Sequence, residues 1–138
     1  MENEEKLQEV LAHTIRDNSL VYLVKCANLG VGVGVTLIVE GQLISGNLVS
    51  GEIYAKDSAQ KLRNVNVDES IKNTMASFFD SLAADYQPTE GHLAPLNFLH
   101  LQNPAYLRGD GGWTTNPGSI LRVNIAKVSG FHLGKIGG

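Results

Sequence analysis

The sequence predicts an α+β fold, in which helices pack on a small, strongly bent antiparallel β-sheet. Two strand-like runs, 35–39 and 43–49, are separated only by Glu40-Gly41, a short connection of the kind that joins antiparallel strands. Apolar residues recur at helical spacing on both sides of these runs, and they alternate at strand spacing near the C-terminus. We therefore expect helices first, then a hairpin, a helical insertion and further strands.

Length and composition indicate a single domain over 1–138. The chain has 138 residues, 43% of them hydrophobic and 18% charged, which is enough to bury a core without disulfides or metals. The expected parts are N-terminal helices over 1–30, a first hairpin over 31–51, a helical insertion and loop over 52–95, and C-terminal strands over 96–138.

Two helices are predicted before the first strand. Over 4–15 the apolar residues share one stripe and acidic residues fill the first turn. Asp17-Asn18-Ser19 offers N-cap residue types, and a second helical spacing runs from Leu20 until Asn28-Leu29-Gly30 stops it. The glycine-rich run 30–34 follows a helix and precedes a strand, the reverse of a dinucleotide-binding loop, so we interpret it as a flexible lead into the first strand.

The first hairpin contains two glycines with structural roles. Gly41 can adopt the left-handed backbone of a two-residue turn without steric cost. Gly46 lies in the middle of the second strand, where it marks a bulge, a sharp bend or the close approach of another backbone.

The insertion is less regular in its pattern. Residues 52–63 fit either a short helix or a frayed continuation of the second strand. From Asp68, an N-cap candidate, a helix is predicted as far as 85, and its apolar stripe is typical of core packing. The stripe consists of Ile71, Met75, Phe78, Phe79 and Leu82.

The C-terminal part predicts a strand, a loop and a second hairpin. The strand covers 96–102, and Pro104 is expected to end its pairing or to confine it to an edge. Residues 110–118 are rich in turn formers and predict a mobile loop, in which Trp113 is a candidate contact residue. Alternation over 121–126 and a turn at Ser129-Gly130 predict a hairpin with 131–136, which gives Gly130 a structural role.

Charge and chemistry exclude several classes of function. The net charge of -3 lacks the basic excess of a nucleic-acid-binding surface. The four histidines lack metal-site spacing, Cys26 is alone, and no catalytic constellation is present, so we expect no enzyme, metal or cofactor. An acidic start and the lack of a long apolar run predict a cytoplasmic protein without membrane contact.

The segment 120–136 is the candidate interaction surface. A small sheet keeps open edges, and this segment carries few of the charges and prolines that block edge pairing. We therefore expect a homo-oligomer. With Trp113, the candidate interaction residues are Arg122, Val123, Ile125, Phe131 and Leu133.

Two resemblances bear on function. The N-terminal helix, the strand pair with Gly46 and the segment LRVNIAKVSGFHLG are similar to the Sm-like five-stranded barrel. More specifically, four segments in the same order resemble the gas-vesicle accessory protein U family: 17–28, 35–54, 98–103 and 125–136, closing with GFHLGKI. The chain departs from that pattern at Leu121-Arg122-Val123, where an aromatic-Arg-Gly lead is expected, and its Trp lies upstream at Trp113.

The second resemblance implies a non-enzymatic accessory protein that affects gas-vesicle assembly or clustering and has gas-vesicle proteins as possible partners. The alternative is an Sm-like oligomeric module that binds nucleic acid, which the scattered Lys and Arg disfavour. A small ligand-binding barrel is a third possibility.

Overall fold

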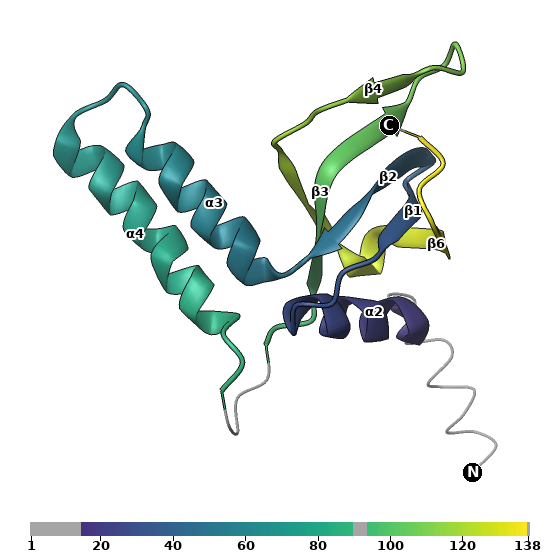
Figure 1. Ribbon diagram of the computed structural model, residues 1–138, viewed down its shortest axis with the longest axis horizontal. Helices are drawn as coiled ribbons and strands as arrows, with labels where there is room; N and C mark the ends of the chain where they lie inside the picture. Colours follow the sequence, from purple (N-terminus) through teal and green to yellow (C-terminus); the bar gives the residue numbers. More distant parts are fainter. Residues whose placement is uncertain (1–14, 90–93, 138) are drawn as a thin grey trace.

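The computed structural model describes residues 15–89 and 94–137, so nearly all of the helix expected over 4–15 lies outside the described residues. The described elements form an α+β fold, as predicted (Figure 1). In chain order they are α2 (Asn18–Asn28), β1 (Gly34–Val39), β2 (Gln42–Val49), α3 (Gly51–Arg63), α4 (Glu69–Asp85), β3 (Phe98–Leu107), β4 (Trp113–Thr115), β5 (Ile120–Asn124), the 3-10 helix η1 (Ile125–Lys127) and β6 (Val128–Leu133).

The strands form one antiparallel six-stranded sheet in the order β4-β3-β2-β1-β6, with β5 paired to β3 beside β4. β5 and β6 pair with β3 and β1 respectively, and no pairing joins them to each other in the described residues. The described sheet is therefore open and has six strands, whereas the Sm-like barrel that the sequence resembles is closed and has five.

α2 lies across one end of the sheet (Figure 1). It begins where the sequence predicts, because the Asp17 carboxylate accepts a hydrogen bond from the backbone N–H of Ser19 at 2.8 Å. It ends before Gly30, whose φ of +96° is the left-handed conformation that follows many helices. Leu20, Val24 and Ala27 form its buried face, and they join the sheet residues in the core.

The first hairpin is confirmed. Val39 pairs with Gln42, and Glu40 and Gly41 both have positive φ, which matches the twist of a two-residue hairpin turn. Val35 and Leu37 are fully buried, as their alternation predicts.

Gly46 lies at a bulge between β2 and β3. The pairing register shifts between Ser45 and Asn47, and a Cβ on Gly46 would lie 3.1 Å from the Leu101 Cβ and 3.3 Å from the Gln102 carbonyl oxygen. The close approach that the sequence indicated is therefore present.

Pro104 neither ends β3 nor places it at an edge, contrary to expectation. β3 continues to Leu107 and pairs with β2 on one side and with β4 and β5 on the other. The proline is tolerated because it sits in the shifted part of the ladder, after Asn103 with its φ of +52°, where no backbone donor is needed. Its carbonyl still accepts from the Asn116 N–H at 3.0 Å.

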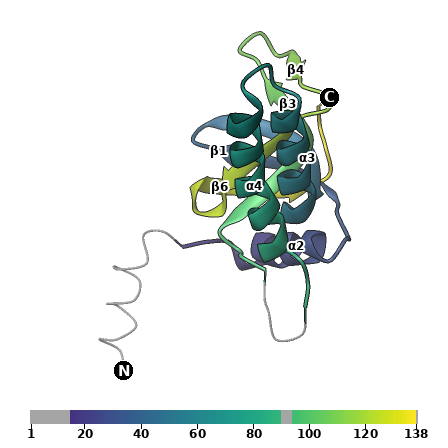
Figure 2. The same ribbon diagram turned by 90° about the vertical axis from the view of Figure 1, so that its left-hand side faces the viewer.

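Residues 51–63 form a helix, which resolves the two alternatives of the sequence. The Ser50 hydroxyl accepts from the Ile53 N–H at 3.1 Å and fixes the start of α3. α3 and α4 pack against each other as an arm that projects from the sheet (Figures 1 and 2). Their buried positions are small residues that let two helix backbones approach closely: Gly51, Ala55 and Ala59 on α3, and Ala76 and Ala83 on α4.

The predicted core stripe of α4 is wrong for two of its residues. Ile71 is 53% exposed and Phe78 is 65% exposed. The helix buries Ala76 and Ala83 instead, since contact with α3 needs small side chains rather than large ones. As predicted, α4 begins after Asp68, although the Asp68 side chain makes no capping bond to the backbone.

The second hairpin is also wrong. β5 pairs with β3, β6 pairs with β1, and η1 joins them, while Ser129 and Gly130 lie within β6. The Asn124 side chain accepts from the Ala126 N–H at 3.0 Å, which stabilises the turn into η1. Ile125 is 1% exposed and packs in the core. Its burial fixes η1 at the point where the chain crosses from β5, which pairs with β3, to β6, which pairs with β1.

Candidate functional site

Three strands of the described sheet, β4, β5 and β6, each have a single strand partner and therefore carry a free edge. β6 pairs only with β1 and β5 pairs only with β3, so each has one row of backbone N–H and C=O groups without a strand partner among residues 15–89 and 94–137. Both strands belong to the segment 120–136 that the sequence marks as the interaction surface. An unpaired edge is a template for another strand.

The direction of the β6 backbone groups follows from one hydrogen bond. The Gly134 N–H donates to the Gly34 carbonyl at 2.8 Å, so Gly134 faces β1. Because the backbone groups of successive strand residues alternate in direction, the N–H groups of Leu133 and Phe131 point to the free edge. The Leu133 side chain is 65% exposed, while Phe131 is half-buried against the core.

Three of the candidate residues lie on or next to β5, and two of these are core residues. Val123 is 6% exposed and Ile125 is 1% exposed, so neither side chain is available to a partner. Their alternating pattern, read from the sequence as an interaction surface, reflects packing against the sheet. Arg122 points to a different neighbourhood, at the base of the helical arm.

Arg122 belongs to an aromatic cluster that joins the sheet to α3. Its guanidinium carbon lies 4.1 Å from the ring centre of Phe98 and 5.6 Å from that of Tyr54. The Arg122 guanidinium also lies 3.3 Å from the His100 Nε2, and since a guanidinium only donates, this nitrogen is the acceptor.

His100 is 1% exposed and neutral in this cluster. Burial is the main cause that lowers the pKa of His100 from 6.5 to about 3, and the positive charge of Arg122 lowers it further. Its ring lies 4.6 Å from that of Tyr54 and 5.6 Å from that of Tyr86. His100 therefore holds the arm to the sheet and is not placed for proton transfer with solvent.

Trp113 is half-buried because the C-terminal end of the described chain packs against it. A Cβ on Gly137 would lie 2.1 Å from the Trp113 ring, so the last described residues lie directly against the indole. The same segment is held to the sheet by the Ile136 N–H, which donates to the Ser45 hydroxyl at 3.1 Å. This contact is intramolecular and accounts for the buried part of the side chain.

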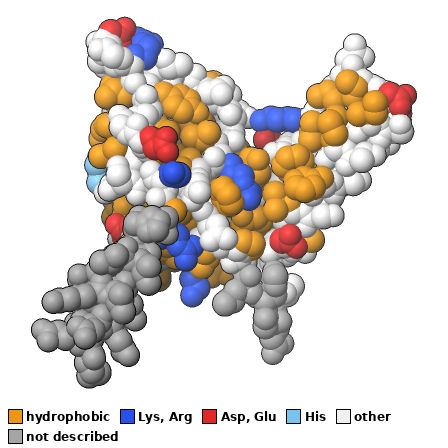
Figure 3. Space-filling model, turned by 180° about the vertical axis from the view of Figure 1, so that it is seen from behind, with side chains coloured by type: hydrophobic (Ala, Val, Ile, Leu, Met, Phe, Trp, Pro, Cys, Tyr) orange, Lys and Arg blue, Asp and Glu red, His pale blue; other side chains and the backbone are white. Residues whose placement is uncertain are grey.

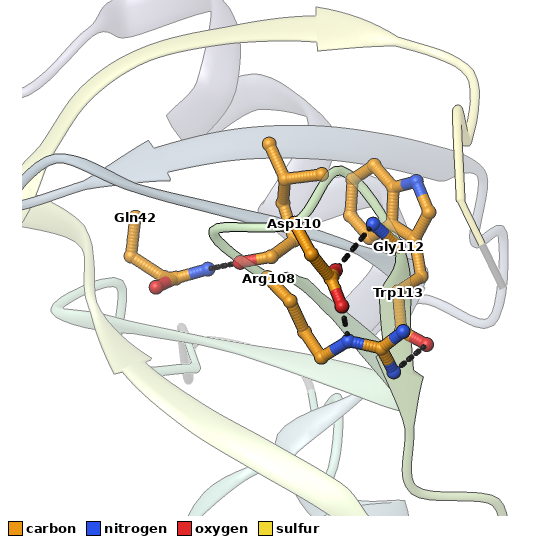
Figure 4. A network of polar contacts seen from close by, with 6 residues as sticks. Gln42, Arg108, Asp110, Gly112 and Trp113 are labelled. Atoms are coloured by element: carbon orange, nitrogen blue, oxygen red, sulfur yellow. Dashed lines mark hydrogen bonds and ion pairs between the residues drawn. The ribbon is translucent and has the colours of Figure 1, made fainter.

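The turn before Trp113 is ordered by its own polar groups (Figure 4). The Asp110 carboxylate accepts from the Gly112 N–H at 2.9 Å and pairs with the Arg108 guanidinium at 3.2 Å, and both contacts lower the pKa of Asp110. The Gln42 side chain donates to the Leu107 carbonyl at 2.8 Å from the neighbouring hairpin. The expected mobile loop is therefore partly a structured β-turn followed by a short strand.

The helical arm carries a hydrophobic surface that the sequence did not reveal. Seen from behind, hydrophobic side chains gather along the arm (Figure 3). The large hydrophobic residues that are exposed on α3, on α4 and in the connection between them are Ile53, Val67, Ile71 and Phe78. Helical spacing alone does not tell a stripe that faces a core from one that faces a partner, so these residues could have been noted only as an apolar face.

The described part of the chain shows no grouping of three or more His, Cys, Asp or Glu side chains suited to a metal ion. Among its helices, none combines the length and apolar character needed to span a membrane.

Comparison with known protein families finds a match. The sequence profile described as "Gas vesicle protein GvpU-like" matches residues 17–136, which include every described helix and strand. No curated protein and no solved structure matches significantly. The match covers most of the chain and agrees with the four segments whose resemblance was noted in the sequence. The chain therefore belongs to the gas vesicle protein GvpU-like family, which makes it a gas-vesicle accessory protein.

Proposed function

We propose that this accessory protein is non-catalytic and affects gas-vesicle assembly or clustering by self-association through the free edges of β5 and β6. The observation that carries the proposal is that β5 and β6, at two different places in the described sheet, each have an unpaired edge. Gas-vesicle proteins are the proposed partners, and the cytoplasm is the proposed location.

Two different edges favour head-to-tail assembly. If β5 of one copy pairs with β6 of the next, the two end copies each keep one edge free until a ring closes, whereas pairing of β6 with β6 alone would stop at a dimer. Head-to-tail growth gives many copies in one particle. Such multivalency strengthens weak contacts to large particles and would promote clustering.

Exposed Leu133 offers a direct test. Leu133→Pro removes an N–H that points to the free edge and leaves the ladder with β1 intact, because that N–H does not face β1. We expect the sedimentation coefficient of the wild type to rise with protein concentration and that of Leu133→Pro to remain that of a monomer.

Leu133→Ala is the matched control, since it shortens the side chain and keeps the N–H. It should still associate if backbone pairing drives assembly. A wild-type monomer at all concentrations would contradict the proposal, and so would an oligomer that persists in Leu133→Pro. Circular dichroism checks that both variants keep the fold.

A further inference from the structure

The C-terminal strap, residues 134–137, crosses the sheet after β6. It leaves β6 at one end of the strand order and reaches Trp113 of β4 at the other end. In Figure 1 the C-terminal end of the chain accordingly lies beside β3 and β4. Between these two ends the strap is bonded to side chains of β1 and β2. The sheet therefore offers it a binding surface that the strand ladders do not use.

Two buried hydroxyls hold the strap backbone. The Thr36 hydroxyl donates to the Gly134 carbonyl at 2.9 Å. Its only proton is then used, so the Ser45 hydroxyl donates to Thr36 across the 2.8 Å that separates them. Both oxygens accept from the Ile136 N–H, at 3.3 Å for Thr36 and 3.1 Å for Ser45. Since Thr36 is 2% exposed and Ser45 is 0% exposed, the pair is closed off from water while the strap is in place.

Glycines determine the fit at both ends of the strap. A Cβ on Gly34 of β1 would lie 3.0 Å from the Lys135 Cγ, so the stem of the lysine lies on bare backbone. A Cβ on Gly137 would lie 2.1 Å from the Trp113 ring, closer than such atoms approach each other in proteins. The surface therefore accepts an extended segment that has glycine at the position facing the indole.

Gly134 joins the strap to β6 and can act as its hinge. Its φ is +94°, and nothing lies within 4 Å of a Cβ built there, so the backbone can turn at this point. We propose that the surface formed by Gly34, Thr36, Ser45 and Trp113 is a recognition site for an extended Gly-Lys-Ile-Gly segment. The strap fills the site in its own chain, and the strap of a second copy takes its place in exchange.

Exchange between copies conserves the contacts. The same hydrogen bonds form whichever copy supplies the strap, so the cost is mainly the lost effective concentration of an attached segment. Four extended residues reach roughly 13 Å, so exchange joins copies that already touch, and this part rests on the self-association proposed above. Recognition of the segment does not rest on it, because a free peptide needs no second copy.

Trp113 is the single tryptophan of the chain, so its fluorescence reports whether the strap is in place. Gly137→Val should move the emission to longer wavelength, because the valine side chain cannot fit against the ring and the indole is released to water. Ile136→Pro removes the N–H that the two hydroxyls bind and should cause the same shift. Gly109→Val is the control, since nothing lies within 4 Å of a Cβ there, and it should keep the wild-type emission. Circular dichroism checks that each variant keeps the fold.

The peptide acetyl-Gly-Lys-Ile-Gly-amide, a copy of residues 134–137, is the probe for recognition. It is titrated into Gly137→Val at low protein concentration, up to millimolar peptide, because short linkers hold attached segments at effective concentrations of that order. We expect a saturable return of the emission toward the wild-type wavelength. A peptide with valine in place of the last glycine should bind at least about tenfold more weakly. Unchanged emission in both strap variants would overturn the proposal, as would a peptide that restores nothing or equal affinity of the two peptides.

Exchange is tested by mixing two variants at high protein concentration. Gly137→Val provides the tryptophan and an empty site, and Trp113→Phe provides an intact strap without tryptophan emission. Excess Trp113→Phe should return the emission toward the wild-type wavelength, whereas the double variant Trp113→Phe/Gly137→Val should not. If sedimentation shows that the copies associate and the emission does not return, exchange is wrong and self-association stands.

Discussion

At Gly46 the bulge leaves little room for a side chain, since a Cβ there would lie 3.1 Å from the Leu101 Cβ. The atoms that a side chain would meet include the Gln102 carbonyl oxygen, which belongs to the sheet backbone and has little freedom to move. A bend of this kind lets β2 curve away from a flat sheet while it keeps its pairing with β1.

We expect Gly46→Val to lower the free energy of unfolding by about 2 kcal/mol or more, because overpacking a strand crossing forces backbone shifts. Thermal unfolding should shift by roughly 5 to 10 °C. Gly130→Val is the control, since a Cβ there meets only the Ile38 side chain at 3.5 Å. Equal shifts for the two variants would show that Gly46 is not needed for close approach.

His100 makes stability depend on pH. Its folded pKa is about 3, below the unfolded value of 6.5, so the unfolded chain binds a proton more readily. The contribution of neutral His100 is fully present above pH 6.5 and is lost progressively as pH falls toward 3. Arg122 is the charged neighbour that opposes protonation.

The prediction is a loss of stability between pH 7 and pH 5 that is reduced in His100→Gln. Few carboxylates titrate in this range, so the histidine effect can be separated from them. Urea unfolding at both pH values gives the measurement. His132→Gln, at an exposed position, serves as the control and should keep the wild-type pH dependence. A His100→Gln variant with the same pH dependence as the wild type would contradict the assignment.

Among the elements, the helical arm departs most from what its pattern predicts. Adjacent Phe78 and Phe79 differ sharply: Phe78 is 65% exposed, whereas the half-buried Phe79 contacts Tyr54 with 6.2 Å between ring centres. Both belong to the stripe that the sequence assigns to a core. The two side chains differ in exposure because Phe79 packs against Tyr54 of α3.

Phe79→Ser should therefore destabilise the monomer by about 2 to 3 kcal/mol, and Phe78→Ser by less than about 1 kcal/mol. Chemical denaturation at low protein concentration measures both. A larger loss for Phe78→Ser would restore the core assignment of the whole stripe.

Elements fixed by local chemistry could be predicted, and those fixed by distant partners could not. Asp17 and Gly41 determine the start of α2 and the turn of the first hairpin through their own backbone preferences. By contrast, the alternation over 121–126 is compatible with several strand partners, and its true partner, β3, is distant in the sequence. The tolerance of Pro104 likewise depends on a bulge opposite Ser45 and Asn47.

The candidate interaction surface over 120–136 could likewise be predicted only in the features that local chemistry determines. An open edge in the segment 120–136 could be expected from its few charges, and β5 and β6 carry such edges. The burial of Val123 and Ile125 could not, since alternation indicates that a face is apolar without identifying what covers it.

For the molecule as a whole, charge argues against RNA as a partner. The net charge is -3, and Lys56, Lys61, Arg63, Lys72 and Lys127 each pair with a carboxylate in the described structure. A surface that tracks phosphates needs cations that are not already neutralised.

We expect no saturable binding of poly-U or poly-A below about 100 µM protein at physiological salt, measured by fluorescence anisotropy. Saturation at low micromolar protein would instead favour an Sm-like nucleic-acid module. Lowering the salt tests whether any residual signal is only electrostatic, since such binding strengthens steeply.

The arm of α3 and α4 packs chiefly on itself and meets the rest of the molecule through few side chains. Tyr54 contacts His100 of β3, and the Lys61 ammonium donates at 2.8 Å to the Gly118 carbonyl between β4 and β5. Arm and sheet are therefore expected to behave as two cooperative units in hydrogen exchange. Amides of the arm would exchange through an opening that leaves the strands protected. A protein built this way can loosen the surface that carries Phe78 without exposing the core of its sheet.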